Sequence, residues 1–141
     1  AGYCYDVLDT PDGGHDASLR PNQIFTVSLP ESPLNQNQQK GVVDACSRSL
    51  LTSYGLRSLD SRDSNYRGRY EGDPLQRDGA YHQGTAWGWL IGAYAIAHFR
   101  VYGDPAKARE FLEPMANHLR DRGLGSLSEI FDGDAPMKPH G

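Results

Sequence analysis

Apolar residues recur at helical spacing in the first half of the chain. Between residues 36 and 51 the apolar side chains fall on one helical face and the polar ones on the other, which predicts an amphipathic helix with one buried stripe. The stripe consists of Val42, Val43, Cys46 and Leu50. A shorter helix is predicted over residues 22–29, because Pro21 suits a first helical turn, where its missing N–H costs nothing.

A second periodic region follows in the second half. Residues 84–102 are apolar on nearly every helical face, which predicts a helix enclosed on several sides. Gly103 is a natural stop for it, and Asp104-Pro105 has the residue types of an N-cap and a first helical position. A further amphipathic helix is therefore predicted from there to about residue 122, ended by Gly123.

Two stretches lack this periodicity. Residues 3–18 are rich in Asp and Gly and are predicted to form an irregular loop. Residues 52–83 are broken by glycine and proline, and a loop of that length is unusual in a compact domain unless it has a function. We expect four apolar or aromatic side chains to anchor this segment, together with short strands. They are Leu56, Leu59, Tyr66 and Tyr70. The patterns predict an all-α fold of about four helices with long loops, in one domain over residues 1–141.

Composition and charge exclude several classes of function. The 141 residues are 38% hydrophobic and 23% charged, as in an ordinary soluble domain, and the net charge of −4 is not gathered in blocks. Without a basic cluster, no nucleic-acid partner is expected. The apolar stretch at residues 87–101 is shorter than a membrane span and contains His98 and Arg100, so no membrane partner is expected.

Metal and cofactor motifs are not recognisable. The two cysteines, Cys4 and Cys46, form no Cys-x-x-Cys pair, and the five histidines have no metal-type spacing. We expect no metal and no cofactor.

The segment at residues 78–89 crowds hydrogen-bonding and aromatic side chains ahead of the long apolar helix. Sugars need polar groups for their hydroxyls and flat apolar rings for their C–H faces, so this mixture suits a sugar site. The alternative is a structural loop in which Tyr81 and Trp87 anchor the start of the helix.

A second candidate lies at Glu129, in a Gly- and Ser-rich loop between Leu127 and Ile130-Phe131. Apolar flanks could hold this carboxylate at a cleft edge, partly desolvated, which is the setting of a general acid or base. The alternative is a solvated surface residue.

Together with Leu19-Arg20-Pro21-Asn22-Gln23, these two segments resemble the C-terminal, amylo-α-1,6-glucosidase part of glycogen debranching enzymes of the bacterial and archaeal type. The resemblance runs over nearly the whole chain. It implies part of an (α/α)6 barrel of the six-hairpin glycosidase type, an α-glucan such as glycogen or limit dextrin as partner, and a cytoplasmic location. Where many members carry Pro between the two tryptophans, this chain has Gly88.

The resemblance also implies roles for individual residues. Glu129 corresponds to the general base of an inverting hydrolysis of α-1,6-linked glucose, and Trp87 to a stacking platform. Asp78 is expected to bind a glucose hydroxyl, with a structural salt bridge as the alternative. The other candidate hydroxyl-binding residues, for which a packing or loop-stabilising role is the alternative, are Arg20, Asn22, Arg77, Tyr81, His82 and Gln83. The family's general-acid segment has no counterpart in this sequence, so we expect a fragment that is inactive by itself.

Two other functions remain open at this stage. The chain could be a non-catalytic glucan-binding or assembly module, or part of a glucoamylase-like glycosidase that cleaves linear α-1,4 chains. The apolar helix at residues 84–102 also predicts a homo-oligomer, because exposed apolar faces tend to be buried by another copy.

Overall fold

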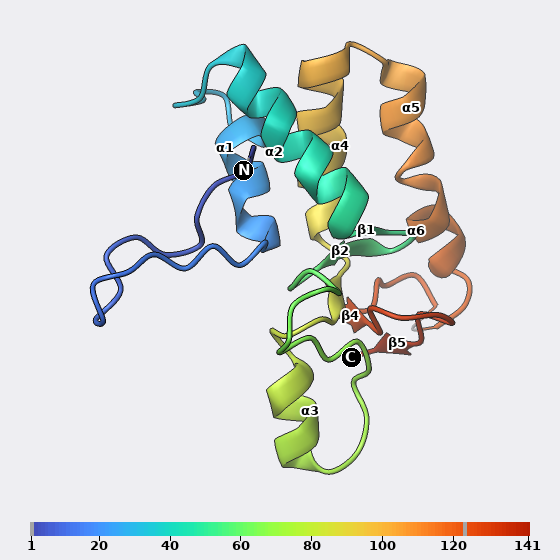
Figure 1. Ribbon diagram of the computed structural model, residues 1–141. Helices are drawn as coiled ribbons and strands as arrows, with labels where there is room; N and C mark the ends of the chain where they lie inside the picture. The colour runs from blue at the N-terminus through green and yellow to red at the C-terminus, as the bar shows by residue number, and fades with distance from the viewer. Residues whose placement is uncertain (1, 123) are drawn as a thin grey trace.

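The computed structural model describes residues 2–122 and 124–141. One short 3₁₀ helix, η1, precedes six α-helices. Their bounds are η1 Pro21–Ile24, α1 Phe25–Ser28, α2 Gln36–Ser49, α3 Pro74–Ala80, α4 Leu90–Tyr102, α5 Pro105–Glu110 and α6 Glu113–His118. The strands are β1 Leu51–Thr52, β2 Gly55–Arg57, β3 Ala86–Trp87, β4 Ile130–Phe131 and β5 Pro139–His140. Figure 1 shows α1, α2, α4 and α5 above the sheet and α3 projecting below it.

The core lies between the helices above the sheet. Helix α4 contacts α1, α2 and α5, and its Tyr94 is almost fully buried. Ile24, Val27 and Val43 contribute fully buried side chains from η1, α1 and α2, and Leu50 does so from the position directly after α2. Burying an aliphatic side chain of this size stabilises the fold by roughly 1.5–3 kcal/mol. This apolar packing holds the helical part of the molecule together.

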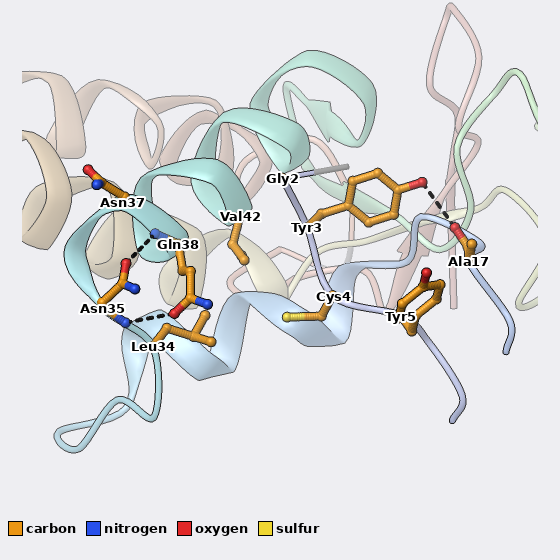
Figure 2. A pocket seen from close by; sticks show the side chains of 10 residues that line it. All are labelled: Gly2, Tyr3, Cys4, Tyr5, Ala17, Leu34, Asn35, Asn37, Gln38 and Val42. Carbon is orange, nitrogen blue, oxygen red and sulfur yellow. Dashed lines mark hydrogen bonds between the residues drawn. The ribbon is translucent and has the colours of Figure 1, made fainter. Parts of the chain in front are cut away.

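Local signals set the ends of α2 and α4. Asn35 and Gln38 form a reciprocal capping box at the start of α2, visible as two dashed bonds in Figure 2. Helix α4 ends at Gly103, whose φ of 68° lies in the left-handed region that glycine adopts without strain. The predictions of the helix at 36–51 and of the stop at Gly103 are therefore confirmed, with α2 ending two residues earlier than expected.

The prediction of an all-α fold is wrong. The five strands form one antiparallel sheet in chain order, with Leu56 opposite Trp87 and Ala86 opposite Phe131. Each strand has only two or three residues, too few for an alternating pattern to appear in the sequence. The described residues combine helices with this sheet and do not form an (α/α)6 barrel.

The helices of the second half also differ from the prediction. The helix expected over residues 84–102 starts at Leu90, because residues 86–87 pair with two strands instead. The helix expected after Asp104 is divided into α5 and α6 at residues 111–112, just before Pro114. Helix α3 was not predicted at all. Gly123, the expected end of the last helix, lies outside the described residues.

Candidate active site

Glu129 lies at the end of the sheet, immediately before β4. Its carbonyl oxygen accepts a hydrogen bond from the Gly88 N–H at 3.3 Å, and the next residue, Ile130, pairs with Trp87 of β3. The Tyr81 hydroxyl donates to Glu129 Oε1 at 2.8 Å. Glu129 itself is exposed. Its apolar neighbours do not cover the carboxylate, because Leu127 is half exposed and Ile130 and Phe131 are buried in the core. The backbone of this residue is therefore fixed, while its carboxylate faces solvent.

A hollow of about 210 Å³ opens beside this carboxylate. Asp78 and Tyr81, at the end of α3, line it together with Tyr70, Ile130, His140 and Gly141. Asp132 holds two of the lining residues in place: its Oδ1 accepts a hydrogen bond from the Tyr70 N–H at 2.9 Å and lies 2.8 Å from His140 Nε2. Two of the predicted carboxylates, Asp78 and Glu129, thus share one hollow with the predicted Tyr81.

Five other predicted residues gather around a second hollow of about 420 Å³. They are Arg20, Asn22, His82, Gln83 and Trp87. The two hollows are neighbours, because Tyr81 lines the first and His82 the second. The Trp87 ring lies flat against His82, with centroids 5.2 Å apart and 4° between the planes, and edge-on to Tyr81 at 4.8 Å.

Arg20 and Arg77 make contacts that favour structural roles. The Arg20 guanidinium donates to Ser58 O, His82 O and Gln83 Oε1 and lies 3.3 Å from Asp6, so it ties the loop before β3 to the N-terminal segment. Arg77 donates to Gly72 O at the start of α3 and, within the described residues, lines neither hollow.

The contact with Glu129 changes the acidity of Tyr81. Its pKa is raised above the usual value, first because Glu129 accepts the hydroxyl proton in a hydrogen bond and then because of burial. Tyr81 therefore remains a donor throughout the neutral range. A carboxylate that receives one such donor is oriented and still has a second oxygen to bind a water and take its proton.

A third hollow, of about 540 Å³, lies apart from the predicted site (Figure 2). It is formed by the N-terminal segment and the start of α2. Several of its polar groups already have partners: Asn35 and Gln38 bond each other, and the Tyr3 hydroxyl donates to Ala17 O. This mainly apolar hollow offers little chemistry.

The family of this chain follows from its similarity to known proteins. The model of the amylo-alpha-1,6-glucosidase family matches residues 1–141. The chain belongs to this family. The glycogen debranching enzyme of Saccharomyces cerevisiae (strain ATCC 204508 / S288c) is 33% identical over 127 residues, which are 84% of this chain and 8% of the yeast enzyme. The resemblance to a debranching enzyme is confirmed, and the chain spans a small part of that relative's length.

Sequence analysis missed two residues in or near the candidate site, Trp89 and His118. Trp89 lines the second hollow, is 59% exposed and stacks on Phe25 with centroids 5.7 Å apart. Its place two residues after Trp87 was a usable signal. His118 contacts Ser128, directly before Glu129, from a different element, and no local pattern marks it.

Across residues 2–122 and 124–141, no cluster of three or more Asp, Glu, His or Cys residues could hold a metal ion. In the same residues, no helix combines the length and the apolar character needed to cross a membrane.

Proposed function

We propose that this chain supplies the general base, Glu129, of an amylo-α-1,6-glucosidase that removes α-1,6-linked glucose at glycogen branch points with inversion. The observation that carries the proposal is the Tyr81–Glu129 hydrogen bond at the edge of the hollow that Asp78 shares. A base needs an oriented carboxylate next to a space for substrate and water, and this contact supplies the orientation.

The two hollows divide the proposed substrate contacts. In the smaller one, Asp78 binds a hydroxyl of the glucose that is cleaved, and Glu129 activates the water. In the larger one, Asn22, His82 and Gln83 offer polar groups while Trp87 and Trp89 offer flat apolar faces, which suits a second glucose unit. Arg20 acts by holding this wall in place.

Inversion requires a second carboxyl group. An inverting glycosidase places its general acid roughly 6.5–9.5 Å from the base, which leaves room for the attacking water. In this proposal the acid comes from a segment outside the 141 residues. The chain alone therefore binds glucan without hydrolysing it, and the complete glucosidase that carries it is active.

The test is Glu129→Gln in that complete glucosidase, assayed by glucose release from a phosphorylase limit dextrin. The amide keeps the shape of the side chain but cannot take a proton, so turnover should fall by roughly 10²–10⁴-fold while maltooligosaccharide binding persists. Glu31→Gln, at an exposed loop residue, is the matched control and should leave turnover unchanged.

Four results would argue against the proposal. Near-normal turnover of Glu129→Gln would identify another base. Glucose released with retained configuration, followed by NMR, would contradict inversion. Glucan binding without hydrolysis in the complete protein would instead favour a binding module, and cleavage of linear α-1,4 chains a glucoamylase-like enzyme.

A further inference from the structure

We infer that His118 is a positioning residue for the base: it holds the backbone directly before Glu129 through Ser128. This inference rests on the proposed role of Glu129. His118 Nε2 accepts a hydrogen bond from the Ser128 N–H at 3.2 Å and lies 3.1 Å from Ser128 Oγ. Both residues are buried, so water cannot readily replace these contacts.

The environment of His118 restricts its ring. Only 2% of the residue is exposed, and the ring packs edge-on against Phe131 at 4.9 Å and Tyr54 at 5.9 Å. Tyr54 in turn stacks on Phe131, with centroids 4.6 Å apart. Helix α6, the β1–β2 turn and strand β4 therefore meet at this imidazole, which fixes Nε2 in space.

The contact with a backbone N–H defines the form of the imidazole. Because Nε2 accepts a hydrogen bond, it carries a lone pair, and the ring proton belongs on Nδ1. Nδ1 lies on the side of Asp121, whose Oδ2 is 3.9 Å away. This tautomer follows from the hydrogen-bond partners.

The two flanks of Glu129 are held by different means. On the C-terminal side, Ile130 pairs with Trp87 in the sheet, and the Gly88 N–H bonds the Glu129 carbonyl. On the N-terminal side, residues 124–127 lie outside the helices and strands, and the Gly125 N–H donates to Leu119 O at 2.9 Å. The bond from Ser128 to His118 lies closer to Glu129 in the chain and holds the residue directly before it. Without it, the carboxylate could shift relative to the substrate, and a misplacement of about 1 Å can reduce turnover roughly 10²-fold.

A pair of amide substitutions tests this role. In His118→Gln the side-chain oxygen can reach the position of Nε2 and accept from the Ser128 N–H. In His118→Asn the shorter amide reaches only the position of Nδ1. In the complete glucosidase, kcat of His118→Asn should fall roughly 10- to 100-fold with KM within about twofold, whereas His118→Gln should recover most of the kcat.

Equal kcat values for the two variants would overturn the inference, as would a loss that appears mainly in KM. A purely structural role would lower the thermal stability of both variants without this split. The pattern therefore separates positioning from simple loss of packing.

A second measurement uses the 141-residue chain and needs no catalysis. Hydrogen exchange at the Ser128 amide, followed by NMR, should be slow in the native chain and in His118→Gln and at least tenfold faster in His118→Asn. Equal protection in all three would contradict the proposed anchor. In the native chain, the ¹⁵N shift of His118 Nε2 should be that of an unprotonated acceptor nitrogen, and a protonated Nε2 would also refute it.

These measurements keep the two proposals distinguishable. If Glu129→Gln retains turnover, the base has been assigned wrongly, but Ser128 exchange still reports whether His118 holds the loop. If Glu129→Gln is inactive and His118→Asn is fully active, the base stands and the positioning role fails.

Discussion

The helical and sheet parts of the molecule share one apolar core, to which the strands contribute Leu56, Ala86 and Phe131, but the two parts differ in their further contacts. In the helical part, α1, α2 and α4 pack through fully buried apolar side chains such as Val27, Val43 and Tyr94. In the sheet part, strands of two or three residues are supported by hydrogen bonds from side chains: Arg57 Nε donates to Gly133 O at 2.9 Å, and Ser58 Oγ accepts from the Gly84 N–H at 2.8 Å.

The difference assigns separate tasks to the two parts. Apolar burial is non-directional and supplies most of the stability of a fold. Hydrogen bonds are directional, contribute less net free energy and fix positions. Glu129 lies in the sheet part, although Asn22 of η1 also lines the larger hollow of the candidate site. Substitutions in the helical part should therefore reduce stability, and substitutions around Glu129 should reduce activity.

The largest change in stability is expected for Ile24→Ala, in the helical part. Ile24 is fully buried, and removing its methyl and methylene groups should lower the free energy of unfolding by about 2–5 kcal/mol. Urea denaturation measures this loss, with the 54% exposed Leu29→Ala as control. Glucan binding by the folded fraction should be unchanged, and altered binding would break the division between the two parts.

An intermediate effect, on activity and not on stability, is expected for Tyr81→Phe. The variant removes the hydroxyl that donates to Glu129 and orients its carboxylate, so kcat should fall roughly tenfold or more. The tyrosine is only partly buried, and the urea midpoint should therefore hardly move. Tyr5→Phe, at an exposed tyrosine, is the control; a stability loss as large as that of Ile24→Ala would contradict the comparison.

The smallest expected effect is a change in the pH dependence of stability, and it concerns Tyr66, whose hydroxyl bonds to Asp134. Burial and its hydrogen bond to Asp134 raise its pKa to about 12, from 10.0. Between these values the unfolded chain has lost the proton and the folded chain keeps it, so stability falls as pH rises from 10 to 12. The urea midpoint of the native chain should fall between pH 9 and pH 11.5, and that of Tyr66→Phe should fall less. An equal fall in both proteins would show that Tyr66 does not contribute to this pH dependence.

The parts that sequence analysis predicted well are those with long periodic patterns. The stripe of Val42, Val43, Cys46 and Leu50 was sufficient to predict α2, because helix formation and burial of one face follow from the same spacing. The strands could not be predicted, because a pair such as Ala86-Trp87 is too short to show alternation and continues into an apolar helix.

Helix α3 was missed although its signal was present. Asp73-Pro74 has the same form as Asp104-Pro105, and Asp73 caps the Gln76 N–H as Asp104 caps that of Lys107. The glycines on both sides, Gly72 and Gly84, favoured the interpretation of this segment as a loop. In the site, Glu129 and Tyr81 came from recognisable motifs, whereas His118 becomes relevant only through a tertiary contact that no local pattern reveals.

The order of the strands has a consequence for the folding pathway. β1 and β2 form a local hairpin, but β3 follows β2 only after residues 58–85, and β4 follows β3 only after the helices α4, α5 and α6. Closing such long loops costs entropy before any pairing is gained, so contacts distant in sequence form late. Glu129, next to β4, should reach Tyr81 only after the helices have docked, and an incompletely folded chain would then lack the hydrogen bond that orients the Glu129 carboxylate.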